Sequence, residues 1–376
     1  MRVCYWGTYD ASYVRNRVLI RGLRLAGAEV SEQHANLWSA RDERVREASR
    51  RSPSLALVVR AAWAYLRLSV RLLATRRPDV VIVGYPGQVD VLVARVLCWI
   101  RRIPLVFDAY LSAYETAVID RGLLSPRSFQ ARVLRHVERL GCRLADLVLL
   151  DTEADCGYFR HEYGAGRYAR VWVGADEPSI VPEPHSASHQ FFDVLFAGTF
   201  IPLHGVEHIL RAAEILQRSA PDVRITLIGS GQTYAAMRRL ATVLQLRNVE
   251  WGAEWLTQQA LAERMARADL VLGVFGTSAK AQRVIPAKAY AALALGRPLL
   301  TADTPGAREA LVDHETAFFC AAGDAAALAE AIIAIRDDPV LAESVGAQGH
   351  ALFEACFSPA AVGTQLMKLL CQLVSQ

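Results

Sequence analysis

The chain has 376 residues, of which 53% are hydrophobic and 21% are charged, and its formal net charge is +4. This length favours two domains of ordinary size, and the composition excludes a disordered chain. The seven cysteines are odd in number and form no CxxC pair, which argues against a disulfide framework or a zinc site. We expect free thiols in a reducing compartment and, since a strand-like MRVCYWG opens the chain, no secretory signal.

The first half of the chain alternates strand and helix patterns, which predicts a parallel, doubly wound α/β sheet. The expected strands cover residues 1–6, 28–33, 80–83, 104–107 and 146–150. The expected helices cover residues 14–27, 90–101 and 126–145.

A basic stretch interrupts this alternation. Residues 41–102 hold 13 arginines against five aspartates and glutamates. From residue 55 to 73 the arginines interrupt an apolar run, so this segment is too charged to span a bilayer. It is typical of a basic amphipathic helix, and residues 41–77 are a candidate contact with an anionic membrane surface. The alternative is an ordinary helix with its apolar face in the core. We expect no nucleic-acid partner, because the stretch lacks the glycines and aromatics of an RNA-binding sheet.

Polar side chains follow two expected strands of the first half. Asp108 follows the run PLVF, and Asp151 follows the run LVLL. In open α/β sheets ligands bind beyond the carboxyl ends of the strands, so Asp108 is a candidate base, acid or charge stabiliser. The alternative for Asp108 is a helix N-cap or a structural hydrogen bond, and for Asp151 we favour N-capping.

A polar, proline-containing segment at residues 181–190 is the best candidate for a linker. Beyond it the alternation restarts. The expected strands cover residues 192–197, 223–228, 249–252, 269–275 and 298–301, and the expected helices residues 205–217, 234–244, 258–266, 287–295 and 359–374. We therefore place one domain at residues 1–184, a second at 185–357 and a C-terminal helix segment at 358–376.

The chain has only three lysines, and two of them, Lys280 and Lys288, flank Arg283 in one loop. This loop leads into an expected helix, for which Pro286 suits the first turn. Free backbone N–H groups and the helix dipole both favour an anion at such a helix start. The loop therefore indicates an anion site, and a solvated surface loop is the alternative.

Glycine turns follow two expected strands of the second half. Gly198 and Thr199 follow the first strand, with His204 at the start of the next helix, and Gly229 and Gly231 follow the second strand. With the lysine-containing loop they indicate a diphosphate held by backbone amides and cations. Plain turns are the alternative for the glycines, and helix capping is the alternative for His204.

Several segments in succession resemble the donor domain of retaining glycosyltransferase family four. They are GTFIPLHGVEHIL, LIGSGQTYAAMRRL, NVEWGA, ADLVLGVFG and IPAKAYAALALGRPLL, and the resemblance covers residues 192–357. It implies the GT-B fold, in which two Rossmann-like, doubly wound domains face each other across a cleft and a C-terminal helix crosses back to the first. It also implies a nucleotide-diphosphate sugar as donor, with no cofactor and no obligatory metal.

The resemblance assigns roles to residues of both halves. In the second half it implies donor-binding roles for Gly198, Thr199, His204, Gly229, Gly231, Lys280, Arg283 and Lys288. In the first half it implies acceptor-binding roles for Gly7, Tyr110, Ser112 and Tyr114. Asp108 stands where the family often has a histidine near the acceptor hydroxyl and is the catalytic candidate.

The chain departs from the common family pattern at four positions. The family has arginine and lysine where Thr199 and His204 stand, and two glutamates where Arg283 and Ala291 stand. The second glutamate usually holds the donor ribose, which alanine cannot do. We expect the cations of the lysine-containing loop to supply the charge that Thr199 and His204 lack.

The resemblance and the basic stretch together predict a cytoplasmic, retaining hexosyltransferase, peripheral at the inner face of the membrane. Its expected acceptor is a cell-envelope glycan or a lipid-linked molecule. One alternative is a nucleotide-sugar-binding pseudoenzyme, motivated by Ala291. The other is a GT-B sugar-nucleotide epimerase, which the sequence matches less well.

Overall fold

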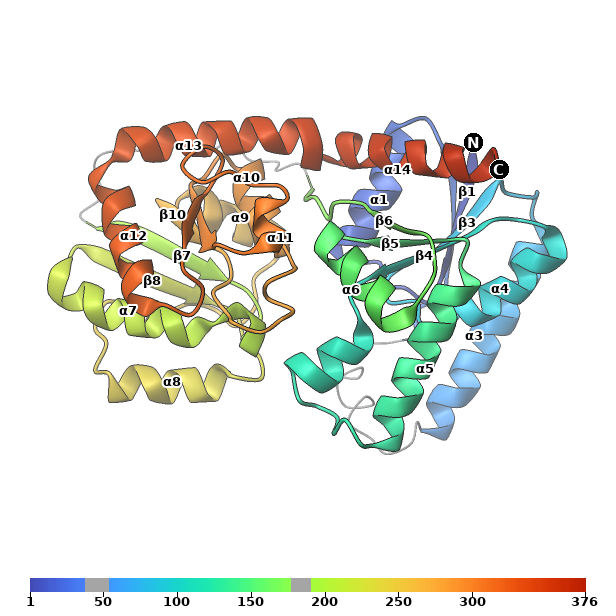
Figure 1. Cartoon of the computed structure of the whole chain (residues 1–376), viewed down its shortest axis with the longest axis horizontal. Coiled ribbons are helices and arrows are strands. Elements are labelled where there is room, and N and C mark those ends of the chain that lie inside the picture. Colours follow the sequence, from blue (N-terminus) through green and yellow to red (C-terminus); the bar gives the residue numbers. More distant parts are fainter. Residues whose placement is uncertain (38–53, 177–190) are drawn as a thin grey trace. The chain divides into compact units, whose positions relative to one another are not determined.

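The computed structural model describes residues 1–37, 54–176 and 191–376, and the chain divides into two compact units (Figure 1). The first unit comprises Met1–Val173 and Pro359–Gln376, and the second comprises Gly174–Ser358. The boundary between the units thus lies at residues 173–174, whereas the sequence analysis ended the first domain at residue 184. The expected linker at 181–190 and residues 41–53 of the basic stretch lie outside the described residues.

The first unit is built on a six-stranded parallel sheet in the order β2-β1-β3-β4-β5-β6. Its strands are β1 (Arg2–Gly7), β2 (Glu29–His34), β3 (Val80–Val83), β4 (Leu105–Tyr110), β5 (Leu147–Leu150) and β6 (Tyr168–Arg170). Its helices are α1 (Val14–Leu25), α3 (Leu55–Ala74), α4 (Asp90–Arg101), η1 (Glu115–Asp120), α5 (Phe129–Leu144), α6 (Glu153–Tyr163) and α14 (Pro359–Val374). Parallel strands need right-handed crossovers, so α3, α4, α5 and α6 cover one face of the sheet and α1 covers the other.

The C-terminal helix α14 packs against α1 of the first unit (Figure 1). Two glycines let the helix backbones approach closely. A Cβ atom added at Gly22 would lie 2.3 Å from the carbonyl oxygen of Pro359, and one added at Gly363 would lie 2.0 Å from that of Gly22. Helix α14 also presents Gln365 to the sheet edge, where its amide donates to the carbonyl oxygen of Arg170 at 3.0 Å.

The second unit is also built on a six-stranded parallel sheet, in the order β12-β11-β10-β7-β8-β9. Its strands are β7 (Phe192–Ala197), β8 (Val223–Ile228), β9 (Val249–Trp251), β10 (Leu270–Leu272), β11 (Leu299–Ala302) and β12 (Phe318–Cys320). Its helices are η2 (Pro202–His204), α7 (Val206–Ser219), α8 (Tyr234–Val243), α9 (Gln258–Ala266), α10 (Ala287–Ala294), α11 (Pro305–Arg308), α12 (Ala325–Asp337), α13 (Pro339–Leu352) and η3 (Phe353–Phe357).

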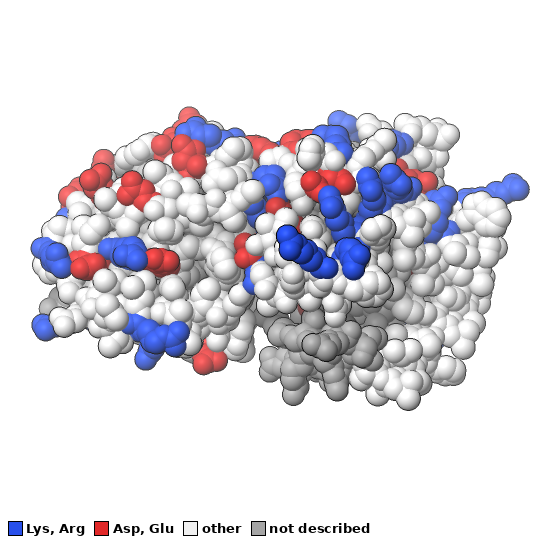
Figure 2. Space-filling model, turned by 60° about the horizontal axis from the view of Figure 1, so that its bottom comes forward, with Lys and Arg blue, Asp and Glu red and all other residues white. Residues whose placement is uncertain are grey.

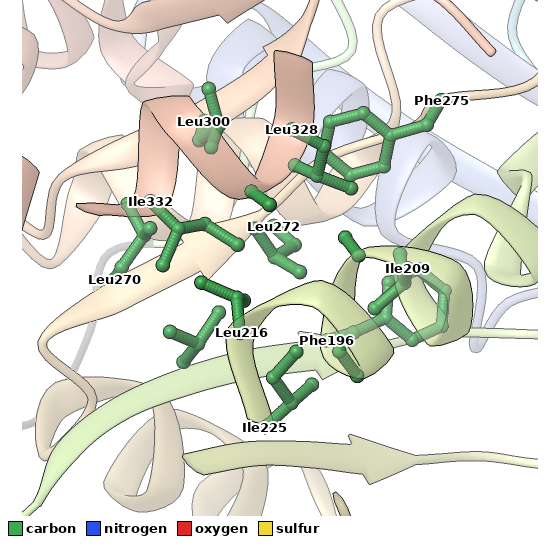
Figure 3. Close-up of a cluster of buried hydrophobic side chains, with 14 of the residues drawn as sticks. Phe196, Ile209, Leu216, Ile225, Leu270, Leu272, Phe275, Leu300, Leu328 and Ile332 are labelled. Carbon is green, nitrogen blue, oxygen red and sulfur yellow. The ribbon is translucent and has the colours of Figure 1, made fainter. Parts of the chain in front are cut away.

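The core of the second unit lies between this sheet and helices α7 and α12. Figure 3 shows Phe196, Ile225 and Leu272 from the strands meeting Ile209 and Leu216 of α7. The five side chains are at most 1% exposed. This packing fixes the strand ends, and with them the turns that carry the candidate site.

The sequence pattern located most of these elements, and the two parallel sheets confirm the predicted α/β class. The expected strand at 269–275 is wrong at its C-terminal end, because β10 stops at Leu272. There the backbone passes close to β11: a Cβ atom added at Gly273 would lie 2.4 Å from the hydroxyl oxygen of Thr301. No helix among the described residues is long and apolar enough to cross a membrane.

Candidate functional site

The strand order of the second unit reverses at β7, which lies between β8 and β10. In doubly wound sheets the ligand crevice opens at such a reversal, beyond the carboxyl ends of the strands. Gly198 follows β7 at this point, and the segment after β10 leads into α10. The structure therefore places the sequence-predicted turns at the expected position for a ligand.

The glycine turns after β7 and β8 are packed directly on one another. Gly229 has φ +130°, and a Cβ atom there would lie 2.0 Å from the carbonyl oxygen of Gly198. Gly231 has φ +155°, and a Cβ atom there would lie 2.7 Å from the carbonyl oxygen of Phe200. The amide of Phe200 donates to the carbonyl oxygen of Ser230 at 3.0 Å, which ties the two turns together. A side chain at either glycine would therefore push the two turns apart.

Lys288, in the first turn of α10, extends toward Gly198 in the first of these two turns. Its ammonium nitrogen lies 3.6 Å from the ring centroid of Phe196, and a Cβ atom at Gly198 would lie 2.7 Å from that nitrogen. The nitrogen is buried and has no hydrogen-bond partner within the described part of the chain. Burial lowers the pKa of Lys288 well below its ordinary value, because the charged form loses its hydration.

Thr199 and His204 complete the same corner of the second unit. The Nδ1 atom of His204 contacts the carbonyl oxygen of Thr199, and the His204 ring meets Phe196 edge-on at 5.8 Å. The backbone carbonyl of His204 accepts a hydrogen bond from the amide of Phe275 at 3.1 Å. Gly205, not His204, is the N-cap residue of α7. His204 thus holds the turn after β7 against the segment that follows β10.

The other two cations of the lysine-containing loop are placed differently. The guanidinium of Arg283 donates to the carbonyl oxygen of Ala279 at 2.9 Å, within its own loop. Lys280 is only 4% exposed. Of the three cations, Lys288 is the one that the structure sets against Gly198. Sequence spacing could not distinguish them, because the distinction depends on where α10 begins relative to β7.

In the first unit, Asp108 lies at the carboxyl end of β4 and is fully buried. The guanidinium of Arg15 donates from Nε to both of its carboxylate oxygens, at 2.8 and 3.0 Å, and Nη2 lies 2.7 Å from Oδ1. Burial raises the pKa of Asp108 above its ordinary value, although the Arg15 charge opposes that rise. Arg15 also donates from Nη1 to the carbonyl oxygen of Val171 at 2.9 Å. The guanidinium thus connects Asp108 to the backbone that follows β6.

Sequence reasoning missed Arg15 and two tyrosines at this edge of the first sheet. The ring of Tyr110 lies 5.0 Å from that of Tyr85 and 5.8 Å from that of Tyr13. The guanidinium of Arg15 lies over the Tyr110 ring at 5.0 Å. Tyr110 itself has φ +57°, an uncommon conformation for a side chain of this size. The sequence near each residue gives no indication of this group, because its members lie near the ends of three different strands.

The remaining acceptor residues expected from the sequence are held by the first unit itself. The hydroxyl of Ser112 donates to the buried carboxylate of Glu138 at 2.7 Å, and Tyr114 lies under the guanidinium of Arg135 at 5.5 Å. Gly7 has φ +128°, and a Cβ atom there would lie 2.3 Å from the carboxylate of Asp90. The structure thus gathers Tyr110 with other tyrosines and does not bring Ser112, Tyr114 and Gly7 to that group.

Asp151 is buried at the end of β5, next to Asp155. The favoured N-cap role is wrong, because the side chain of Thr152 caps α6 and accepts from the amide of Asp155 at 3.1 Å. Burial, and after it the Asp155 charge, raise the pKa of Asp151 well above its ordinary value. Elsewhere in the described ranges, no group of three or more His, Cys, Asp or Glu is placed to hold a metal ion.

The family match falls within the second unit. Residues 181–351 match the family described as "Glycosyl transferases group 1". A GDP-mannose-dependent monoacylated alpha-(1-6)-phosphatidylinositol monomannoside mannosyltransferase of Corynebacterium glutamicum is 28% identical over 172 residues, 45% of this chain and 44% of that protein. A D-inositol 3-phosphate glycosyltransferase of Streptomyces avermitilis is 27% identical over 251 residues, 64% of this chain and 49% of that protein. The chain therefore spans about half the length of the curated relatives it matches.

Solved structures match both units. Sucrose-phosphate synthase from Thermosynechococcus elongatus has a TM-score of 0.72 and 18% identity, and the match covers 100% of this chain and 99% of that one. Anabaena HepE in complex with UDP-glucose has a TM-score of 0.69 and 18% identity, covering 99% and 100%. At this identity the likeness shows the fold alone, which is the GT-B fold with its two α/β domains.

Proposed function

We propose that this chain, whose second domain belongs to the glycosyl transferases group 1 family, moves a hexose from a nucleotide-diphosphate sugar to an acceptor hydroxyl. The donor would occupy the carboxyl edge of the second sheet. The proposed transfer proceeds with retention at the sugar carbon and without an obligatory metal. Anabaena HepE, a structural neighbour, has been captured with UDP-glucose, which supports a donor of this class.

The observation that carries the proposal is the buried ammonium nitrogen of Lys288. It lies beside Gly198, in the turn after β7, and has no hydrogen-bond partner in the described ranges. A buried charge without a partner is costly, so such a group is best explained by a ligand of opposite charge. The first N–H groups of α10 add a partial positive charge at the same place.

A diphosphate bound there would gain charge during the reaction. In the proposed transfer the bond from the sugar carbon to the diphosphate oxygen breaks and a bond to the acceptor oxygen forms. The acceptor's proton leaves to the departing diphosphate. Lys288 and the α10 amides would stabilise the negative charge that grows on the leaving group, and this is where fixed cations lower the barrier most.

On the acceptor side we propose a positioning role for Asp108 in place of the acid–base role expected from the sequence. Its carboxylate is fully buried and bound by Arg15, so its geometry suits holding Arg15 against the ring of Tyr110. The relatives in Corynebacterium and Streptomyces are named for inositol-containing acceptors, one of them a lipid. With the basic residues of 41–77, this supports a cell-envelope or lipid-linked acceptor reached from the inner face of the membrane.

A second candidate is a protein that binds nucleotide sugars without transferring them, and Ala291 favours it. Ala291 lies three residues after Lys288 on α10, so both fall on one side of the helix. No carboxylate can hold the donor ribose from that position. In the first candidate the charge of Lys288 makes up for this loss, whereas in the second the donor binds and no sugar moves.

Thermal shift with UDP-glucose and GDP-mannose, followed by transfer to a lipid-extract acceptor pool, tests the proposal. A donor that binds the folded state raises the melting temperature by mass action. We expect Lys288→Met to weaken donor binding by about 1.5–3 kcal/mol, about 10- to 150-fold, because it removes a charge-assisted contact. The matched control is Lys368→Met, at an exposed position of α14, which should bind like the wild type.

Two outcomes would contradict the proposal: no shift with any nucleotide sugar, or equal donor binding by both lysine variants. Binding without transfer or hydrolysis would favour the second candidate. Ala291→Glu then separates a lost function from a retuned one. A large gain in donor affinity would mark a site that has lost its ribose contact, whereas no gain would mark one that works through Lys288.

A further inference from the structure

Helix α3 of the first unit has two apolar faces. On one face Leu68 and Leu72 are fully buried in the core of the unit. On the opposite face large apolar residues recur every three or four positions and are exposed: Leu55, Val59, Trp63, Leu66, Val70 and Leu73. A helix that needs only one apolar face for its own domain has a second one available for a partner.

The neighbouring helices extend this exposed apolar surface. Helices α3, α4 and α5 pack side by side in chain order and cover the same face of the sheet. On α4 and α5 the large exposed apolar residues are Val96, Trp99, Ile100, Phe129, Val133 and Leu140. Together with the α3 residues they form what we call the three-helix face. Trp63 and Trp99 are 67% and 73% exposed, and tryptophans are typical of membrane interfaces.

Arginines border the three-helix face. Arg60, Arg67 and Arg71 lie along α3 between its exposed and buried faces, and residues 54–78 contain no aspartate or glutamate. Figure 2 shows, on this unit, a broad white area of uncharged residues bordered by blue basic side chains. A second copy meeting this face would set arginine rows against each other, whereas anionic lipid headgroups would complement them.

The face continues into a hollow of about 850 Å³ at the amino-terminal edge of the sheet. Its lining includes the apolar side chains of Trp99 and Ile100 and the cationic side chains of Arg102 and Arg167. It also includes Asp146, whose carboxylate pairs with Arg95 at 2.9 Å. Apolar and cationic groups side by side match the boundary between the acyl chains and the phosphates of a bilayer.

We infer that the three-helix face docks on the surface of a bilayer that contains anionic phospholipids. The apolar side chains of α3, α4 and α5 enter the acyl boundary while the arginines remain at the level of the phosphates. Docking of the three-helix face specifies the membrane contact that the proposed function includes. The inference rests on the proposed function for its lipid-linked acceptor and is independent of the proposed transfer chemistry. It also moves the contact beyond residues 41–77, because α4 and α5 take part.

Flotation of the full chain with phosphatidylcholine vesicles, with and without phosphatidylglycerol, tests this inference. We expect binding to the anionic vesicles that salt weakens without abolishing, since salt screens the arginines and leaves the apolar contacts. Vesicles with brominated acyl chains should quench Trp63 and Trp99. The double variant Trp63→Ser/Trp99→Ser should bind at least about tenfold more weakly, because two large apolar side chains no longer enter the bilayer.

The matched control is Val243→Ser/Val340→Ser, whose valines are 76% and 78% exposed on the second unit. It should float like the wild type. Absence of flotation, or equal flotation of the tryptophan variant, would overturn the inference. So would a dimer that the tryptophan variant converts to a monomer, because a second copy would then cover the face. A thermal shift with UDP-glucose in the same samples reports the donor site separately, so failure of one proposal leaves the other standing.

Discussion

The first unit holds its buried carboxylate, Asp108, in a pair with Arg15, whereas the second leaves the buried amine of Lys288 without a hydrogen-bond partner in the described ranges. Both groups lie at the carboxyl edge of a six-stranded parallel sheet. Paired charges stabilise the arrangement of the elements that carry them. A buried amine without such a partner forms an ion pair only when a ligand supplies the opposite charge. The contrast therefore separates the scaffold of one unit from the proposed binding group of the other.

The largest effect should come from breaking the buried pair of the first unit. Asp108→Ala leaves the Arg15 guanidinium buried and unpaired, which should lower the free energy of unfolding by about 3–5 kcal/mol. Urea denaturation followed by tryptophan fluorescence measures the change. Asp303→Ala is the matched control, because Asp303 pairs with Arg308 on the surface of the second unit and should matter little.

Asp108→Asn distinguishes a positioning role of the Arg15–Asp108 pair from a direct role of the pair in catalysis. A positioning role predicts that Asp108→Asn retains measurable transfer at low temperature, since the amide can still accept a hydrogen bond from Arg15. Loss of all transfer with unchanged stability would contradict it. Replacing both partners with apolar residues, Arg15→Leu/Asp108→Leu, should recover much of the lost stability.

A smaller effect is expected at the double turn of the second unit. Gly229→Ala places a Cβ atom 2.0 Å from the carbonyl oxygen of Gly198 and forces an L residue into positive φ. Gly164 also has a positive φ, +88°, so Gly164→Ala carries a similar backbone penalty. Its new Cβ atom would have no other atom within 4 Å. The backbone penalty alone is about 1–2 kcal/mol, so Gly229→Ala should cost clearly more than Gly164→Ala in melting experiments.

Donor binding should be a second readout for the same pair of variants. Gly229→Ala should also lose the UDP-glucose thermal shift, because the new methyl group separates the turns after β7 and β8. Gly164→Ala should retain the shift. Equal costs and equal shifts would show that the close approach of the two turns is unimportant for the site.

The smallest expected effect is the uptake of a proton by Lys288 when the donor binds. At a pH above its lowered pKa, the Lys288 amine is neutral when no ligand is bound. A bound diphosphate should raise that pKa, because its negative charge favours the protonated amine. UDP-glucose binding should then take up a proton, and affinity should fall as the pH rises toward the ordinary lysine value of about 10.4. Calorimetry in buffers of different ionisation enthalpy measures this uptake.

Stability without ligand should respond to pH with the opposite sign. The unfolded chain binds the Lys288 proton more tightly than the folded chain does, so stability should rise with pH between the lowered and the ordinary pKa. Lys288→Met should show neither proton uptake nor this rise. A wild type that binds UDP-glucose without proton exchange at any pH in that window would contradict the assignment.

The local elements followed well from sequence patterns. The turns at Gly198 and Gly229 were predicted from glycines after apolar runs, and α14 was predicted at residues 359–374. Such patterns act within a few residues, through the strand and helix periods and through backbone freedom at glycine. The cap of α6 was mistaken, because Asp151 and Thr152 are neighbours and either could cap a helix.

The site itself followed less well, because its pairs are distant in the chain. Arg15 and Asp108 are 93 residues apart and nothing in either local segment indicates the other. Ser112 and Tyr114 follow a strand as a ligand-binding residue would, yet Ser112 turns inward to Glu138. The three cations of the lysine-containing loop look alike in sequence until the packing of α10 sets Lys288 against Gly198.

By itself the sequence determined two α/β units, the glycine turns of the second and the cations near them, because these depend on local periodicity and residue type. Only the tertiary structure decided which charges have partners and which apolar faces are covered. Helix α3 illustrates this: its sequence predicts an amphipathic helix, but the packing of Leu68 and Leu72 in the core is what leaves Trp63 and its neighbours outside. Burial is a property of the whole arrangement, since the partners that exclude water come from distant parts of the chain.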